Sequence, residues 1–156
     1  MHLEINGWDA GISFSACHFI PGHDKCSRLH GHNYAIHTKV HGTKDKRGML
    51  LDFIAIKNAL RNVAEELDHR VLIPGDSKEM EIVIGDDLKV TVGEKRYVFP
   101  LDDVVVMDIA QASAEELAGF VLKRLLSMLT IPENVDAIEV GLDEGKGQGA
   151  WVKREF

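Results

Sequence analysis

Residues 14–34, FSACHFIPGHDKCSRLHGHNY, decide the fold and the chemistry that the chain is expected to have. The first part belongs to a segment, residues 10–19, that alternates with the period of a strand, and the residues of one parity are Ile12, Phe14, Ala16 and His18. A turn follows at residues 21–24 (PGHD), and residues 32–41 alternate again. Two successive amphipathic strands most simply form an antiparallel pair.

Two later segments change to the period of a helix. Residues 52–67 repeat apolar side chains every three or four positions, which predicts an amphipathic helix with Asp52 as its N-cap. Residues 113–129 predict a second helix, because Ser113 and Glu116 have the spacing of a capping box.

The remaining segments predict strands. Residues 78–107 contain short strand-like runs around glycine turns, and residues 137–144 and 149–155 predict a final strand pair. The order of strand pair, helix, β-rich excursion, helix and strand pair predicts an α+β fold, with helices on one face of a sheet. Assembly of several sheets into a closed barrel would cover the other face and remove the sheet edges.

Composition limits the possible function classes. The chain has 156 residues with 45% hydrophobic side chains, so we expect one globular domain over residues 1–156. The net charge of −7 argues against nucleic acid or an anionic membrane as the main partner. No apolar run approaches the roughly 20 residues of a membrane helix, and the first residues lack the pattern of a secretion signal. We therefore expect a cytoplasmic protein.

Histidine is concentrated near the start of the chain. There are eight His and two Cys, and six of the His lie within residues 18–41. Two cysteines do not form a disulfide framework, and clustered His beside a Cys indicates a metal site or a reactive thiol. Cys17 has the opposite parity to His18 and is interpreted as a packing residue. Cys26 lies outside the strand pattern and is expected to be exposed and reactive.

Three of the histidines form a candidate metal site. His30 and His32 point to the same face of a strand, and the antiparallel neighbour could bring His18 to the same place. Three neutral imidazoles without a fourth protein ligand describe an open catalytic zinc site, although ordinary structural histidines remain the alternative. His37 and His41 are expected to be solvated or to face a lumen, and His23 to be exposed in the turn.

An ordered set of motifs resembles the 6-pyruvoyltetrahydropterin synthase / 6-carboxytetrahydropterin synthase family over nearly the whole chain. The first matches are Phe14 with His18, and then Cys26 with the His-Gly-His-Asn-Tyr run at residues 30–34. The later matches are Gly48 to Phe53 leading to Lys57, Leu67-Asp68-His69, residues 113–118 (SAEELA), and Glu144 six residues before Ala150.

The resemblance implies a tunnelling fold (T-fold), in which a four-stranded antiparallel sheet carries two helices on one face. Three such subunits close a barrel, and two trimers commonly stack, so a homotrimer or homohexamer with active sites at subunit interfaces is implied. Zinc, one ion per subunit, would be held by His18, His30 and His32. A β-rich insertion at about residues 76–100 exceeds the usual length, and we expect it to be an oligomer-contact or rim element.

The resemblance also implies the substrate, 7,8-dihydroneopterin triphosphate, and a role for each of several residues. Cys26 would be the catalytic base, assisted by an acid–base pair, Asp68 and His69. Glu144 would anchor the pterin by a bidentate pairing, with Glu139 as its rival. Ser113 stands where the family has Pro-Thr and could contact substrate. The residues that could bind the triphosphate are Lys25, Arg28 and Lys57.

Two reactions compete within the family. The spacing Cys-x-x-x-His-Gly-His resembles the enzymes that release acetaldehyde and triphosphate and form 6-carboxytetrahydropterin, the precursor of 7-deazaguanine nucleosides. The pyruvoyl enzymes, which eliminate triphosphate without loss of acetaldehyde, typically have a longer spacer. The glycine-rich run after Glu144 departs from the family pattern. A non-catalytic zinc-binding oligomer is the alternative from another class, and the joint presence of Cys26, Asp68 and His69 argues against it.

Overall fold

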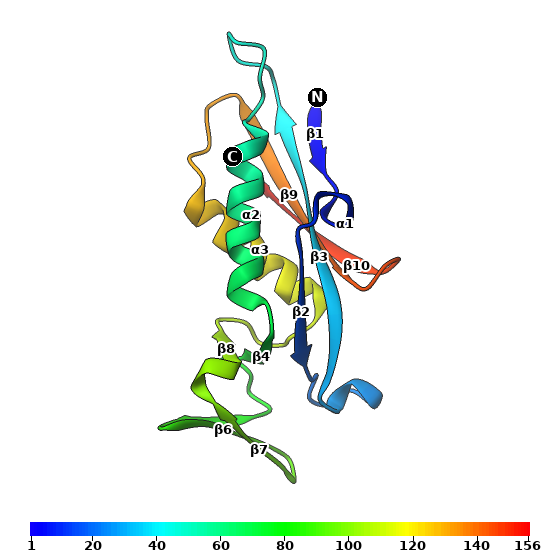
Figure 1. The fold of residues 1–156 in the computed structure, drawn as a ribbon, viewed down its shortest axis with the longest axis vertical. Helices are drawn as coiled ribbons and strands as arrows, with labels where there is room; N and C mark the ends of the chain where they lie inside the picture. Colours follow the sequence, from blue (N-terminus) through cyan, green and yellow to red (C-terminus); the bar gives the residue numbers. More distant parts are fainter.

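The computed structural model describes residues 1–156, and its centre is an antiparallel sheet with two long helices packed against it (Figure 1). Four strands form this centre in the spatial order β10-β9-β3-β2. Their bounds are Ser13–His18 for β2, His30–Gly42 for β3, Val135–Glu144 for β9 and Gly149–Glu155 for β10. These are the four strands predicted from the alternation of apolar residues.

The sheet is larger than the four strands that were expected. β1 (His2–Ile5) pairs with β3, and β4 (Arg70–Pro74) and β8 (Val104–Met107) extend the sheet beyond β2 in parallel, which makes seven strands. A short parallel strand is an apolar run without alternation, so the sequence pattern gave no period by which β4 could be recognised.

Two amphipathic helices supply the other half of the core. α2 (Phe53–Leu67) and α3 (Ala114–Met128) have the predicted bounds, and Asp52 and Ser113 are their N-caps. Both helices bury an apolar stripe in one cluster with β2, β3 and β9, for example Leu60 and Val121. Each such buried side chain contributes about 1.5–3 kcal/mol, so this layer accounts for much of the stability. A single turn, α1 (Gly7–Ala10), connects β1 to β2.

The β-rich excursion forms a separate three-stranded antiparallel sheet of β5 (Glu81–Ile84), β6 (Asp87–Val92) and β7 (Lys95–Pro100). It lies at the end of the molecule where β2 finishes (Figure 1). A second, smaller core joins this sheet to the main one, and its buried members are Phe19, Ile73, Leu88, Val90 and Val104. The excursion is therefore anchored beside the start of the loop that follows β2.

Strand register brings the candidate residues to this same end of the sheet. His18, the last residue of β2, pairs directly with His30, the first residue of β3. β4 begins at Arg70 beside Ala16 of β2, so the end of α2 at Asp68 lies next to the same strand. No helix of the structure is long and apolar enough to span a bilayer.

Candidate metal centre and its surroundings

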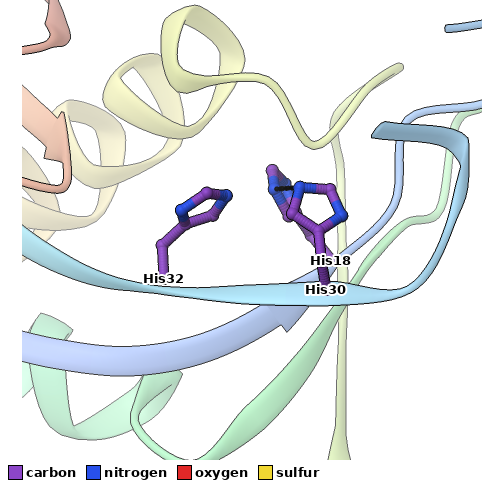
Figure 2. A group of neighbouring side chains, drawn as sticks. All are labelled: His18, His30 and His32. Atoms are coloured by element: carbon purple, nitrogen blue, oxygen red, sulfur yellow. Dashed lines mark hydrogen bonds between the residues drawn. The ribbon is translucent and has the colours of Figure 1, made fainter. Parts of the chain in front are cut away.

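Three imidazoles converge at the paired ends of β2 and β3. His18, His30 and His32 project from the two strands toward one another below the N-terminus of α3 (Figure 2). One ring nitrogen from each lies within 4.8 Å of the others. The His18–His30 register pair and the two-residue spacing of His30 and His32 produce this arrangement, as the sequence predicted.

Backbone carbonyls fix how two of these rings are presented. The Nδ1 of His18 lies 2.6 Å from the carbonyl oxygen of Ala112, and the Nδ1 of His30 lies 2.6 Å from that of Arg28. A carbonyl only accepts, so each Nδ1 carries the proton and donates it. The Nε2 atoms are then unprotonated lone pairs when the rings are neutral, which is the state of a metal ligand.

The arrangement of lone pairs fits a shared cation. The Nε2 atoms of His18 and His30 face each other at 3.1 Å, although neither has a proton to donate when both Nδ1 atoms are protonated (Figure 2). The Nε2 of His32 is buried and has no hydrogen-bond partner. Two lone pairs that face each other and a third buried ring nitrogen without a partner fit the requirements of a zinc ion, and such groups are otherwise costly to bury.

Burial keeps the central ring neutral. The His18 side chain is 1% exposed, and burial lowers its pKa, against the opposing effects of the Ala112 hydrogen bond and the Glu144 charge. A lowered pKa keeps the ring unprotonated at neutral pH, so His18 is ready to coordinate without first losing a proton.

Glu144 reaches the histidine cluster, and its rival Glu139 does not. One carboxylate oxygen of Glu144 lies 3.3 Å from Nε2 of His18 and 3.8 Å from Nε2 of His32. The Tyr34 hydroxyl donates to the same oxygen at 3.4 Å. Glu139 instead contacts His41 at 2.7 Å, farther along β9. The geometry therefore favours Glu144 as the carboxylate of this site.

Tyr34 also belongs to the site. It is the last residue of the 30–34 motif, and the sequence had suggested no role for it. Its side chain is fully buried, and burial, followed by the Glu144 charge, raises the pKa of its phenol far above the usual range. Tyr34 shares the parity of His32, so the two-residue spacing was a signal that could have identified it. The carbonyls of Ala112 and Arg28 gave no such signal, since any residue type supplies one.

Asp68 and His69 form a hydrogen-bonded pair at the end of α2. The Nδ1–H of His69 donates to Asp68 at 2.7 Å, and the backbone N–H of Ser15 donates to the other carboxylate oxygen at 2.8 Å. Burial alone would raise the pKa of Asp68, but these hydrogen bonds lower it overall. His69 has a left-handed backbone (φ 57°) and its side chain is 83% exposed, so its Nε2 points outward.

The Asp68–His69 pair and the three histidines lie on opposite faces of β2 and β3. His69 borders an open cleft of about 600 Å³ whose lining includes Ser15, Cys17 and Asn33. These side chains have odd parity in the two strands, whereas His18, His30 and His32 have even parity. His32 also lines this cleft, but His69 is not among the residues whose ligand atoms cluster within 4.8 Å.

The two cysteines occupy different surroundings. Cys17 is half-buried and borders this cleft, on the face of β2 that is turned away from the main core. Cys26 lies in a short 3₁₀ turn, Lys25–Ser27, of the loop that joins the ends of β2 and β3. It is half-buried, and its sulfur is not one of the clustered ligand atoms.

The other named residues are distributed around this end of the sheet. Ser113 caps α3, where its hydroxyl accepts from Glu116 N–H at 3.4 Å, directly after the carbonyl that holds His18. Lys25 and Arg28 flank Cys26 and are exposed, whereas Lys57 lies in the second turn of α2, far along that helix from Asp68.

Two histidines outside the cluster, His23 and His37, differ in their exposure to solvent. His23 is exposed, as expected. Of the two expectations for His37, solvated or lumen-facing, the first is wrong, because the residue is 7% exposed and lies against α1. The Gly7 N–H donates to its Nδ1 at 3.1 Å, and Asp143 lies 3.1 Å from its Nε2. His37 is therefore a buried residue whose Nδ1 is hydrogen-bonded and whose Nε2 lies beside the Asp143 carboxylate without a hydrogen bond of good geometry.

Comparison with known proteins places the chain among tetrahydropterin synthases. The family model described as 6-pyruvoyl tetrahydropterin synthase matches residues 10–155. A Methanocaldococcus jannaschii protein named "Putative 6-carboxy-5,6,7,8-tetrahydropterin synthase" is 32% identical over 99% of this chain and 97% of its own. A Rickettsia felis protein named "6-carboxy-5,6,7,8-tetrahydropterin synthase" is 38% identical over 55% of this chain and 62% of its own.

Two solved structures share the fold of this chain but carry the 6-pyruvoyl name rather than the 6-carboxy name. A catalytic-residue mutant of the Plasmodium vivax 6-pyruvoyltetrahydropterin synthase superposes with a TM-score of 0.92 at 30% identity, over 100% of this chain and 98% of that one. The Caenorhabditis elegans 6-pyruvoyl tetrahydropterin synthase, at 20% identity and a TM-score of 0.61, shares the fold.

Proposed function

Because the chain belongs to the 6-pyruvoyl tetrahydropterin synthase family, we propose that it is a zinc-dependent 6-carboxytetrahydropterin synthase. It would convert 7,8-dihydroneopterin triphosphate to 6-carboxy-5,6,7,8-tetrahydropterin, with release of acetaldehyde and triphosphate. The observation that carries the proposal is that one ring nitrogen from each of His18, His30 and His32 lies within 4.8 Å of the others, with the lone pairs of two of them fixed by backbone carbonyls. The names of the Methanocaldococcus and Rickettsia relatives support the choice of reaction.

His18, His30 and His32 would hold one zinc ion per subunit. When bound, the ion would polarise the side-chain oxygens of the substrate and so acidify the neighbouring C–H bonds. The carbonyls of Ala112 and Arg28 keep the Nδ1 protons of His18 and His30 turned away from the ion. These carbonyls therefore preset the ligand state that binding requires.

Glu144 would anchor the pterin ring. A carboxylate accepts two parallel hydrogen bonds, which matches the 2-amino group and adjacent ring N–H of a pterin. The Tyr34 hydroxyl, which donates to Glu144, would hold the carboxylate in place while the substrate is absent. The anchor stands at the end of β9, beside the strand that carries His32, so ring binding and side-chain polarisation would occur within one site.

Proton transfer would involve Cys26 and the Asp68–His69 pair. The thiolate of Cys26 would accept the proton from the substrate carbon, and Cys26 lies in the loop that joins the strand of His18 to the strand of His30. Asp68 holds His69 in the tautomer whose Nε2 is free to accept or return a proton. Because the His69 side chain faces outward from the opposite side of the sheet, it would serve the site of a neighbouring subunit in a homotrimer or homohexamer.

The 6-pyruvoyl reaction is the second candidate, because the Plasmodium vivax structure that superposes over the whole chain is a 6-pyruvoyltetrahydropterin synthase. The same residues could eliminate triphosphate and isomerise the side chain without cleaving a carbon–carbon bond. A non-catalytic zinc-binding oligomer is a third, and only assay of turnover separates it from the other two.

The test is turnover by chelated and zinc-reloaded enzyme, with the pterin product identified by mass spectrometry. We expect the reloaded enzyme to form the carboxy product and the chelated enzyme to be inactive. Formation of the pyruvoyl product alone would establish the second candidate instead. Zinc-loaded enzyme without any turnover would support the non-catalytic reading.

A further inference from the structure

We propose that the three-stranded sheet β5–β7 braces the loop at residues 19–29, and that Lys95 is a positioning residue for the Cys26 thiol. The catalytic part of this inference rests on the proposed function, because it takes Cys26 as the base. Two contacts between this sheet and the loop carry it, and a third contact, from Glu79 just before β5, supports it.

The first contact joins Lys95 to the turn that holds Cys26. The Lys95 ammonium donates to the carbonyl of Ser27 at 2.7 Å and lies 3.4 Å from its hydroxyl. The Ser27 hydroxyl in turn donates to the carbonyl of Asp24 at 2.8 Å. Lys95 begins β7 directly after the β6–β7 turn, where Gly93 has a left-handed backbone (φ 58°). The end of the β6–β7 hairpin is therefore hydrogen-bonded to Ser27, the residue that follows Cys26.

The second contact is a pair of stacked rings. Phe19, which follows the proposed ligand His18, stacks on Tyr97 of β7 with ring centres 5.1 Å apart and planes inclined by 18°. Phe19 is 1% exposed and belongs to the small core shared with Leu88 and Val90 of β6. Offset stacking and burial of this size fix the point where the loop leaves β2.

The third contact lies at the first bend of the loop. Gly22 has φ 74°, and a Cβ built there would lie 3.0 Å from a carboxylate oxygen of Glu79. The other carboxylate oxygen of Glu79 accepts from the Gln111 amide at 3.0 Å. Gln111 directly precedes Ala112, whose carbonyl orients His18. Glu79, which precedes β5, therefore lies against the first bend of the loop. Through Gln111 it is also linked to Ala112, whose carbonyl orients His18.

The loop has little regular structure of its own to hold Cys26. It contains one 3₁₀ turn of three residues, with the Ile20 N–H bonded to the Cys26 carbonyl at 2.7 Å. A general base must lie within hydrogen-bond reach of the proton it removes, and a misplacement of about 1 Å can cost about a hundredfold in rate. The bond from Lys95 to the Ser27 carbonyl would add a contact from outside the loop to the four backbone hydrogen bonds that the loop makes within itself.

The experiment replaces Lys95 by Gln and uses Lys89→Gln, an exposed lysine of β6 without a contact to the loop, as the matched control. Alkylation of Cys26 by iodoacetamide is followed by peptide mass spectrometry in the oligomeric enzyme, with Cys17 as the internal reference. We expect Lys95→Gln to raise the alkylation rate of Cys26 about threefold or more, with Cys17 unchanged. Turnover should fall about tenfold in kcat with KM changed less than twofold, and Lys95→Arg should restore both values.

The alkylation readout separates the two hypotheses. If alkylation of Cys26 rises in Lys95→Gln but neither the wild type nor any variant turns over the pterin substrate, the result supports the bracing of the loop by β5–β7 and refutes the proposed function. If Cys26 alkylation and hydrogen exchange of residues 20–28 match those of Lys89→Gln, the brace is refuted, whatever the enzyme catalyses. Altered alkylation with unchanged kcat in an active enzyme would refute the positioning role of Lys95.

Discussion

Two hydrogen bonds to backbone carbonyls define the site at the scale of single residues. They hold the protons of His18 and His30 on Nδ1, so that both Nε2 atoms keep a lone pair that can coordinate a cation. Sequence could predict which histidines meet, because strand parity and register follow from the alternation. It could not predict the tautomers, because the carbonyls belong to Ala112 and Arg28, whose side chains carry no such information.

Replacing Cys26 tests the division between ligand and base. We expect Cys26→Ala to retain one zinc ion per subunit, because the Cys26 sulfur is not among the clustered ligand atoms. Turnover should fall by about a hundredfold or more, the usual contribution of a general base. Zinc content is measured by elemental analysis and turnover by product formation, with Cys17→Ala as the control that keeps both. Loss of zinc from Cys26→Ala would make this residue a ligand and overturn its assignment as the base.

The charge of Asp68 contributes to stability in a defined pH range. Its pKa is lowered in the folded chain, so its contribution is fully present above the ordinary carboxyl pKa of about 3.9 and is lost as pH falls through the folded pKa. We expect Asp68→Asn to have a lower melting temperature than the wild type at pH 7. The gap should shrink as pH falls below about 4, as followed by circular dichroism. A gap that is independent of pH would show that the charge of Asp68 is not responsible.

At the scale of elements, the helices were more predictable than the sheet. The bounds and caps of α2 and α3 follow from local spacing, because a helix satisfies its hydrogen bonds within one segment. β4 and β8 join the sheet through parallel pairing between segments far apart in sequence, which no local pattern encodes. The cleft bordered by His69 depends on that pairing, so its lining could not be predicted either.

The two N-caps should differ in strength because their hydrogen bonds differ. Asp52 accepts from Ile54 N–H at 2.8 Å, whereas Ser113 accepts from Glu116 N–H at 3.4 Å. We expect Asp52→Ala to lower the free energy of unfolding by about 1 kcal/mol and Ser113→Ala by less. Chemical denaturation of each variant measures this difference. An equal or larger loss for Ser113→Ala would show that Ser113 supports the fold through more than this bond.

At the scale of the whole molecule, one chain presents its proposed catalytic groups on two sides. The histidine cluster lies under α3, and His69 faces outward from the opposite side of the sheet. β10 also ends the sheet with an unpaired edge, which a neighbouring sheet could complete. Both features favour the shared active sites that we propose.

Shared sites can be tested by mixing inactive subunits. Cys26→Ala and His69→Ala should each be inactive as pure oligomers. After denaturation and refolding together in equal amounts, some interfaces would combine the intact Cys26 of one chain with the intact His69 of another. We expect the mixed oligomer to recover a substantial fraction, about a quarter, of the wild-type rate under random assembly. Refolded mixtures that stay inactive, beside a wild-type sample that recovers under the same protocol, would place each site within one chain.

The proposed reaction is tested by the ratio of acetaldehyde to triphosphate that the enzyme releases from 7,8-dihydroneopterin triphosphate. The zinc-loaded enzyme should release one acetaldehyde for each triphosphate, because the 6-carboxy reaction breaks the side chain as well as the phosphate ester. Triphosphate released without acetaldehyde would contradict the account and assign the 6-pyruvoyl reaction to this chain.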